Sequence, residues 1–355
     1  MRQPIGIIGT GSYLPVHSVS NTEVAAEAGV TDEWITRKTR IRSRRRAAPH
    51  EATSDLAAAA ARAALVQAGI TADQVSYLVV ATSTPDHPQP ATASIVQHLI
   101  GATNAAAFDV NSVCSGFVFA LSVANGLLHD QPHGYALVIG ADVYSRILDR
   151  SDRKTAILFG DGAGAVLLGP VAAGQGLLGT RLTTRGDQHE LIGVPAGGSR
   201  TPASAATVAN GQHYFTMNGR AVRSFVDASL SSEVEALLRD TSVAAQDVQH
   251  FVPHQANGTM LSDVWPKLGL DGATCHVKLE HYGNTGAASI PITLDLVHRK
   301  RLLAENDLVL LCGFGGGMSI GSSLLSWPPT RYARSAAVFT PERDKVGATA
   351  FAGLH

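Results

Sequence analysis

Cys114 is the residue in this sequence whose position best suits nucleophilic chemistry. It lies between a short apolar segment, residues 107–110, and a segment of helical composition that runs through Leu121 and Leu127. A thiol at a helix start faces unpaired N–H groups and the positive end of the helix dipole. Both favour the thiolate, which is the nucleophilic form. Free cysteines are commonly buried and inert, so the position predicts either a nucleophile or a structural cysteine.

Three further features could act together with this thiol. His254 follows Pro253 at the end of an apolar segment, Asn284 lies among glycines, and residues 315–317 are all glycine. Each has an ordinary alternative: a histidine satisfied by its neighbours, a turn-forming asparagine, or a flexible loop. Together they fit thioester chemistry, in which a thiolate accepts an acyl group and N–H donors stabilise an oxyanion or enolate.

Bulk composition limits the other classes of function. The chain has 355 residues, 45% of them hydrophobic, and a net charge of −1, which suits a large core and no nucleic-acid partner. Its three cysteines make no disulfide framework, and no apolar stretch reaches the roughly 18 residues of a membrane span. We therefore expect a cytoplasmic protein with no membrane partner. The basic run at residues 37–46 is either solvated surface or a patch for a phosphorylated or acidic partner.

Alternating strands and helices are predicted along the chain. The glycines at positions 9 and 11 follow an apolar strand, but a dinucleotide-binding loop is excluded because its third glycine is missing and Pro15 follows. We predict a glycine turn there instead. An alanine-rich helix is expected over residues 56–67, ended by Gly69.

The second half of the chain repeats the first at a constant offset. Residues 75–79 match 248–252, and residues 136–140 match 309–313, both at a shift of 173 that also takes Cys114 to Ala287. This pattern predicts an internal duplication with two α/β halves packed in layers around buried helices. Because sites in such sheets lie at the carboxyl ends of strands, the four segments with chemical potential would converge between the halves.

Seven segments resemble, in chain order, the β-ketoacyl-acyl-carrier-protein synthase III family of the thiolase superfamily. They are residues 32–35, 84–86, 109–117, 159–165, 253–257, 282–286 and 314–317. The resemblance implies an α/β, thiolase-like αβαβα fold and a homodimer. Its N-terminal half would be residues 1–172, with Cys114, and its C-terminal half 173–327, with His254 and Asn284. Residues 328–355 would form an extension, either a loosely attached arm or a lid.

The resemblance also implies roles for individual residues. Cys114 would attack an acyl-CoA, with the backbone N–H groups of Cys114 and Gly316 holding the oxyanion. Malonyl on an acyl carrier protein would follow, and His254 and Asn284 would donate to its thioester carbonyl as CO2 departs, with no cofactor beyond the CoA thioester substrate. The positions that would bind CoA are Trp34, Lys38, Arg153 and Asn257. Those that would line the acyl pocket are Gln89, Met217 and Arg223.

Four residues depart from the family pattern. Gln89 replaces a common aromatic that reaches into the partner's pocket, and Arg223 replaces an apolar residue at the entrance. Thr259 replaces a basic residue that helps dock the carrier protein, and Arg40 replaces a glycine. We therefore predict a primer other than acetyl, as in enzymes that start polyketides or specialised fatty acids. The alternatives are an acyltransferase that uses an alcohol or amine without decarboxylation, and a non-catalytic subunit of a complex.

Overall fold

Two five-stranded sheets of the same strand order form the frame of the protein. The structure is a computed structural model that describes residues 3–131 and 133–329. The first sheet has the order β1 (Ile5–Tyr13), β7 (Gly162–Pro170), β6 (Tyr135–Asp142), β4 (Val75–Ala81), β5 (Ala106–Val110). The second has the matching order β8 (Gly176–Thr184), β14 (Ser319–Ser326), β13 (Leu308–Gly315), β11 (His250–Pro253), β12 (Thr274–Cys275). The predicted duplication is thereby confirmed.

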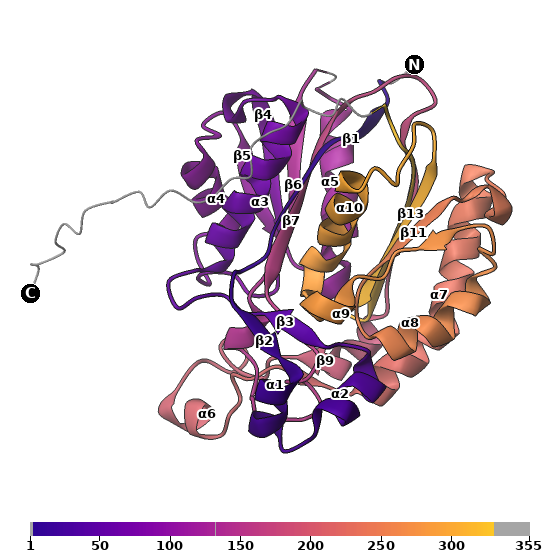
Figure 1. The fold of residues 1–355 in the computed structure, drawn as a ribbon. Helices are drawn as coiled ribbons and strands as arrows, with labels where there is room; N and C mark the ends of the chain where they lie inside the picture. Colours follow the sequence, from indigo (N-terminus) through magenta and orange to yellow (C-terminus); the bar gives the residue numbers. More distant parts are fainter. Residues whose placement is uncertain (1–2, 132, 330–355) are drawn as a thin grey trace, which may run out of the picture.

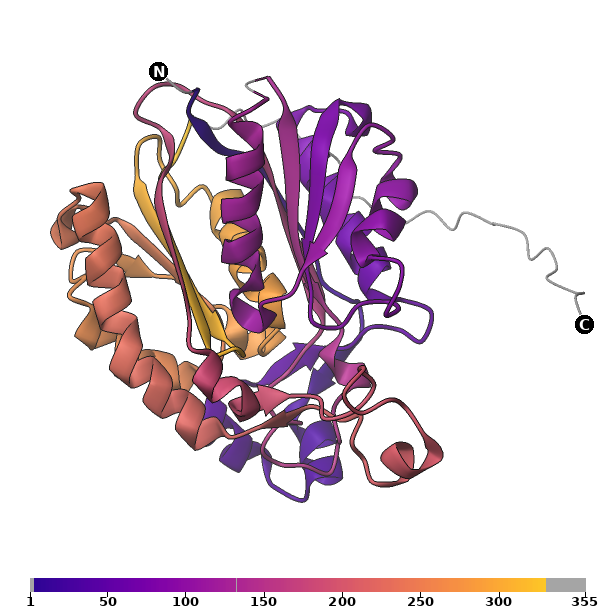
Figure 2. The same ribbon diagram turned by 180° about the vertical axis from the view of Figure 1, so that it is seen from behind.

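The helices complete a five-layer αβαβα arrangement (Figures 1 and 2). Two of them lie between the sheets, α5 (Gly116–Leu128) and α10 (Ser289–Arg299). The outer face of the first sheet carries α3 (Thr53–Ala68) and α4 (Thr92–Ile100), and α7 (Gly219–Thr241) packs on β8 and β14 of the second. Side chains from both sheets and both central helices share one buried apolar core, which includes Val79, Leu121, Val138, Leu294 and Leu311.

Shorter elements cover the lower end of these layers in Figure 1. They are β2 (Ser18–Ser20), α1 (Asn21–Ala28), α2 (Asp32–Thr39), β3 (Ser43–Arg45), β9 (Ile192–Gly193), α6 (Ala205–Ala209) and β10 (Thr216–Met217). Beside them lie α8 (Gly258–Val264) and α9 (Leu279–Tyr282). The predicted boundary at residue 172 falls between the end of β7 and the start of β8. The predicted extension, 328–355, lies almost wholly outside the described residues.

The N-terminal glycines lie inside a strand and not in the predicted turn. A Cβ on Gly11 would lie 2.4 Å from the Ala60 carbonyl oxygen of α3, and one on Gly9 would lie 2.7 Å from that of Ala64. The missing side chains therefore let α3 pack directly on β1. The turn prediction was wrong because it considered backbone freedom and not the close approach of a helix.

The basic run is exposed at Arg37, Lys38, Arg40 and Arg42, as the solvated-surface alternative predicted, but the arginines that follow are structural. The Arg44 side chain is buried and donates to Asn21 Oδ1 and to the Ile157 carbonyl, each at 2.8 Å. Burial lowers the pKa of Arg44 to about 10. Arg45 donates to the carbonyls of residues 15 and 16, and Arg42 pairs with Glu280. The run therefore ties β3 to its neighbours.

Within residues 3–131 and 133–329, no helix has the length and apolarity to cross a membrane.

Candidate active site

Cys114 lies in a single 3₁₀ turn, η2 (Val113–Ser115), between β5 and α5. Val113 has a φ of +46°, a left-handed conformation that is rare for a β-branched residue. Its N–H donates to Asn111 Oδ1 at 3.2 Å, which holds the turn. Such strained backbone is found most often at functional sites. The turn places Cys114 at the start of α5, as predicted, and leaves the residue only 6% exposed.

The glycines at the end of β13 pack directly against this turn. A Cβ on Gly315 would lie 2.8 Å from Cβ and 2.9 Å from N of Cys114. A Cβ on Gly316 would lie 2.9 Å from a methyl group of Val113. Only backbone can come this close, so the run is a close-packed wall and not a flexible loop. Gly316, predicted to supply an oxyanion N–H, lies beside the turn that holds Cys114.

His254 is buried at the end of β11. Its N–H donates to the Cys312 carbonyl at 2.8 Å, and its Nδ1 lies 2.7 Å from Ser289 Oγ. Because Ser289 Oγ also accepts the N–H of Gln255, its own proton is available to Nδ1, and the neutral ring then carries its proton on Nε2. Burial lowers the pKa of His254 to about 3, so the imidazole is neutral at neutral pH.

Asn284 forms a turn, as its ordinary interpretation predicted, but of its two side-chain polar atoms only Oδ1 takes part in that turn. Asn284 Oδ1 accepts the N–H of Gly286 at 2.9 Å. Its backbone bridges to the strand-like segment at Phe159, with N–H to the Leu158 carbonyl at 2.8 Å. These contacts fix the amide and leave Nδ2 as its donor. The side chain that forms a turn can therefore also donate to a ligand.

The predicted convergence of the three residues is visible in how their elements pack. The turn η2 contacts both β13 and η7 (Gly286–Ala288), which follows Asn284. In β13, Phe314 meets the His254 ring edge-to-face at a centroid distance of 5.2 Å, and the next residue, Gly315, touches Cys114. One short stretch of strand thus links the thiol to the imidazole.

The electrostatics of Cys114 differ from the sequence prediction. Burial is the largest cause that raises the pKa of the thiol, and the Asp142 carboxylate raises it further. The residue's own N–H and the Tyr144 hydroxyl act in the opposite direction by hydrogen bonding. The expected bias toward thiolate is therefore outweighed by desolvation. At rest the sulfur is a thiol, which must lose its proton as it reacts.

Asp142 was not selected from the sequence, although it ends an apolar strand, where sites concentrate. Its carboxylate is fully buried at the end of β6. Oδ1 accepts the N–H and O–H groups of Ser83 at 2.9 and 3.1 Å, and Oδ2 accepts the N–H of Ala287 at 2.8 Å. Burial raises the pKa of Asp142 to about 6. This carboxylate joins the first half of the chain to the turn η7 of the second.

Tyr144 was also missed, because nothing in its local sequence marks it. It lies in η3 (Tyr144–Arg146), two residues beyond Asp142, and its side chain is 1% exposed. Its ring stacks on Phe159 at 4.3 Å and meets Phe215 edge-to-face at 5.4 Å. The hydroxyl lies 2.9 Å from Ser83 Oγ.

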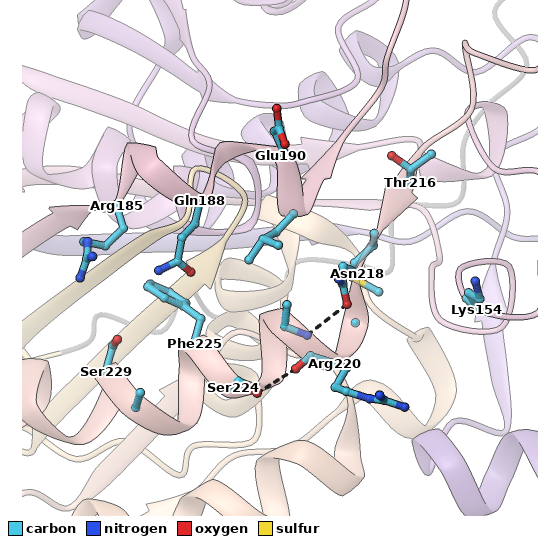
Figure 3. A pocket seen from close by; sticks show the side chains of 15 residues that line it. Lys154, Arg185, Gln188, Glu190, Thr216, Asn218, Arg220, Ser224, Phe225 and Ser229 are labelled. Carbon is cyan, nitrogen blue, oxygen red and sulfur yellow. Dashed lines mark hydrogen bonds between the residues drawn. The ribbon is translucent and has the colours of Figure 1, made fainter.

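An open cleft of about 1310 Å³ lies between the segment after β8, β10 and the start of α7 (Figure 3). Met217, a predicted acyl-pocket residue, lines it together with the basic side chains Lys154, Arg185 and Arg220. Met217 pairs with Ile192 of β9, whose Cγ2 lies 3.3 Å from the Cβ position of Gly316. The inner wall of the cleft is thus one strand away from the Cys114 turn.

Three of the four predicted CoA-binding residues meet where α2 packs on α8. Trp34 and Lys38 lie on α2, and Asn257 caps α8 through Oδ1 and donates from Nδ2 to the Lys38 carbonyl at 3.2 Å. Arg153 is exposed beside Lys154, which lines the cleft.

The residues that depart from the family pattern lie at the surface. Gln89 is exposed in the loop before α4. Arg223 is exposed on α7 and pairs with Asp263 of α8, so its charge is directed toward α8. Thr259 Oγ1 lies 3.5 Å from the Arg37 carbonyl.

Two family models match the chain. A model of 3-oxoacyl-[acyl-carrier-protein] synthase III matches residues 108–186, and the model of its C-terminal part matches residues 238–327. The first match contains Cys114 and the second contains His254 and Asn284.

Individual relatives cover almost the whole described chain. The chain is 57% identical over 323 residues to acetoacetyl CoA synthase NphT7 of Streptomyces sp. (strain CL190), covering 90% of this chain and 98% of that protein. The crystal structure of 3-oxoacyl-(acyl carrier protein) synthase III from Pseudomonas aeruginosa PAO1 has 38% identity and a TM-score of 0.84, with 92% and 99% of the two chains covered. The priming β-ketosynthase of the R1128 polyketide pathway has 30% identity and a TM-score of 0.85, with 92% and 97% covered.

Proposed function

The chain belongs to the 3-oxoacyl-[acyl-carrier-protein] synthase III family, and from this premise we propose that it joins an acyl group held on Cys114 to a malonyl thioester with loss of CO2. It is an acyl-transferring condensing enzyme, as its homologues are. The alternative of a non-catalytic subunit is therefore set aside. The observation that carries the proposal is the Cys114 turn packed against Gly315, with the neutral imidazole of His254 packed on Phe314 of the same strand.

The first half-reaction loads the enzyme. The Cys114 sulfur attacks the thioester carbonyl of an acyl-CoA, and the N–H groups of Cys114 and Gly316 stabilise the oxyanion. The bond to the CoA sulfur then breaks. The thiol proton goes to the departing CoA sulfur, so the thiol is consumed although burial raises its pKa. The neutral His254, whose Nε2 already carries its proton, acts in this site as a hydrogen-bond donor.

The second half-reaction forms the carbon–carbon bond. The malonyl thioester loses CO2 and leaves an enolate, whose oxygen accepts hydrogen bonds from Nε2 of His254 and Nδ2 of Asn284. The enolate carbon attacks the acyl carbonyl and the bond to sulfur breaks. The Cys114 thiolate then takes up a proton from solvent, which replaces the one that left with CoA. Every bond and charge balances in this sequence without a metal or redox cofactor, so we propose that none takes part.

CoA is proposed to enter through the open cleft. Its phosphates are anionic, and Lys154 and Arg185 place positive charge at opposite sides of the lining in Figure 3. Trp34, Lys38 and Asn257 form one junction, where an adenine ring could stack and a phosphate could be bound. Its pantetheine arm would pass Met217 toward Gly316 and the Cys114 sulfur.

The primer is proposed to be acetyl, in place of the different primer expected from the sequence. The buried rings of Tyr144, Phe159 and Phe215 pack against one another with centroid distances of 4.3 to 5.4 Å, and Phe159 is bridged to Asn284. The relative named acetoacetyl CoA synthase makes, by that name, a four-carbon product, which a two-carbon primer would supply. The product would start a polyketide or a specialised fatty acid.

The carrier of the malonyl group has two candidates. Malonyl-acyl carrier protein is proposed first, because the matched family model names that carrier. Malonyl-CoA is the second, because the product named for the 57% identical relative is a CoA thioester. Thr259 offers no positive charge to an acidic carrier protein, which also favours the second candidate.

A homodimer is proposed from the first sheet. β5 is an edge strand and its side chains are only half-buried, so a second copy could continue the sheet there. Gln89 lies in an exposed loop of the same half.

The three cysteines are free, which suits the reducing cytoplasm predicted from the sequence.

The test is intact-protein mass spectrometry followed by a chase. The protein is incubated with acetyl-, butyryl- and longer acyl-CoAs, and the loaded enzyme then receives malonyl-CoA or malonyl-acyl carrier protein. We expect a mass increase of one acetyl group, absent from Cys114→Ala, and release of CO2 with loss of the adduct during the chase. Transfer of the acetyl group to an alcohol or amine without CO2 would establish the acyltransferase alternative instead.

A further inference from the structure

The turn that carries Asn284 is held from the other half of the chain by one carboxylate, that of Asp142. Asp142 Oδ2 accepts the Ala287 N–H at 2.8 Å, across 145 positions of sequence. Within the turn itself, Asn284 Oδ1 accepts the Gly286 N–H at 2.9 Å. Two consecutive N–H groups of the turn are thus bound by side-chain oxygens, the first by the amide and the second by Asp142. Neither half-reaction described above uses Asp142.

The carboxylate and the turn are packed in direct contact. A Cβ on Gly286, whose φ is +57°, would lie 2.2 Å from Asp142 Oδ2. A Cβ on Gly140, two residues before Asp142 on β6, would lie 2.3 Å from the Ala287 carbonyl oxygen. Glycine at both positions lets the backbone of η7 lie against the end of β6. The position of the turn is therefore set by β6 and by the carboxylate that ends it.

The other oxygen of Asp142 is held by the segment after β4. Oδ1 accepts the Ser83 N–H at 2.9 Å. It also accepts the hydroxyl groups of Thr82, Ser83 and Thr84 at 3.1 to 3.2 Å. These donors orient the carboxylate, so that Oδ2 faces the turn. Two acceptor oxygens are required here, because the N–H groups of Ser83 and Ala287 can only donate.

We propose that Asp142 is a positioning residue for the Asn284 amide: it holds the Ala287 N–H and thereby fixes the turn from which Nδ2 of Asn284 donates to the enolate oxygen. The inference rests on the function proposed above for Asn284. The backbone of Asn284 is fixed separately, since its N–H donates to the Leu158 carbonyl at 2.8 Å and its carbonyl accepts the Gly160 N–H at 2.9 Å. Loss of the Asp142 bond should therefore misdirect the amide without displacing the residue.

The test compares the two half-reactions in the wild type and in Asp142→Asn. It is run at pH 8, above the pKa of about 6 to which burial raises this carboxyl. Asparagine has nearly the same shape but one acceptor oxygen, so its NH2 group must face either the Ser83 N–H or the Ala287 N–H. The four donors on the Ser83 side favour the oxygen there, which leaves the Ala287 N–H without an acceptor.

We expect this change to act on condensation and not on loading. In single turnovers followed by intact mass, acetyl loading of Cys114 should stay within about threefold of the wild type. The condensation rate should fall by about tenfold or more, as for loss of one buried hydrogen bond. An unchanged condensation rate would overturn the proposal.

The decisive measurement repeats the change in a background without the amide. Asn284→Ala has no amide left to position, so adding Asp142→Asn to it should change the condensation rate by less than about twofold. A purely structural carboxylate would instead lower the rate by the same factor in both backgrounds, and that result would overturn the proposal.

Ser83→Ala is the matched control. It removes one hydroxyl that donates to Oδ1 and leaves the Ser83 N–H and the bond from Oδ2 to Ala287 in place. Condensation should stay within about twofold of the wild type. A loss as large as that of Asp142→Asn would show that the segment after β4, and not the turn, carries the effect, and would overturn the proposal.

Hydrogen–deuterium exchange of peptides over residues 283–289 tests the contact without any substrate. The wild type should protect the Ala287 N–H, and Asp142→Asn should exchange it about tenfold or more faster, with peptides over α4 as the internal reference. Rapid exchange at Ala287 in the wild type would overturn the proposal even if Asp142→Asn does not fold. Failure of acyl-CoA to load wild-type Cys114 would overturn the proposed function but not the exchange result.

Discussion

The turn that holds Cys114 and the turn that holds Ala287 are two copies of one structure with different chemistry. η2 begins at residue 113 and α5 at 116, and η7 begins at 286 and α10 at 289, each 173 positions later. In both copies an asparagine side chain accepts the N–H of the first turn residue, Asn111 for Val113 and Asn284 for Gly286. That first residue has a φ of +46° in one copy and +57° in the other.

The difference between the turns lies in what packs against them. The end of β6 brings Asp142 to the second turn, where it accepts the Ala287 N–H at 2.8 Å. The equivalent residue at the end of β13 is Gly315, which has no side chain to accept the N–H of Cys114. The duplicated fold therefore caps one N–H with a carboxylate and gives the other, which we propose to hold the substrate oxyanion, no such acceptor.

Moving the thiol to the second turn should break the comparison most severely. In the double variant Cys114→Ala with Ala287→Cys, we expect no acyl-enzyme and at least about a thousandfold loss of condensation. The new sulfur would lie on a turn whose N–H is already bound by Asp142. Intact mass after acetyl-CoA measures the adduct, and appearance of an adduct on residue 287 would show that the cap does not matter.

A side chain at the end of β13 should disrupt the first turn. Gly315→Ala puts a Cβ 2.8 Å from Cβ of Cys114, and we expect it to lower the free energy of unfolding by about 1–3 kcal/mol and to abolish loading. Urea unfolding and acetyl loading measure the two effects. Gly126→Ala, in the open space along α5, is the matched control and should be neutral or stabilising by about 0.5–1 kcal/mol. Normal loading by Gly315→Ala would contradict the close-packed wall.

The two turn asparagines should differ when changed in the same way. Asn284→Asp keeps the oxygen that accepts the Gly286 N–H but loses the Nδ2 donor, so loading of Cys114 should persist while condensation falls about a hundredfold or more. Asn111→Asp keeps the matching oxygen for Val113 and should affect condensation little. Single-turnover measurements of adduct formation and decay separate the steps. Equal effects of the two changes would mean that both side chains serve only the turns.

The smallest effect concerns stability in acid. His254 has a folded pKa of about 3, below its unfolded value. From pH 6.5 down to about 4, the unfolded chain therefore binds a proton that the folded chain does not. This histidine alone should reduce the free energy of unfolding by up to about 1.4 kcal/mol per pH unit there. Comparison with His254→Asn by urea unfolding at pH 7, 6 and 5 isolates this slope.

Asp142 acts with the opposite sign. Its folded pKa of about 6 lies above the unfolded value, so the folded state binds the extra proton between about pH 6 and pH 4. Its burial costs stability above that window, and protonation relieves the cost as the pH falls. Asp142→Asn should therefore steepen the acid loss of stability relative to the wild type, and a shallower loss would contradict the assignment.

Much of the fold could be predicted because local sequence patterns specify it. The apolar strands, the 173-residue offset and the order of the family segments identified the two halves, the layered architecture and the family. Cys114, His254 and Asn284 were selected for the same reason, since each follows a strand or opens a turn. The structure brings their elements together, and their chemical roles stay predictions.

Other features were decided only by the tertiary structure, because they depend on contacts between distant segments and on the removal of water from buried groups. Asp142 reaches Ala287 across 145 positions, and Arg44 binds Ile157 across 113. Neither contact has a signal in the local sequence. The charge state of Cys114 was predicted from the helix start it occupies, but its sign was decided by burial under β13 and beside Asp142. Local sequence specifies turns and strand ends. The removal of water from Cys114, and the capping of the Ala287 N–H but not of the equivalent Cys114 N–H, arise only when the two halves pack.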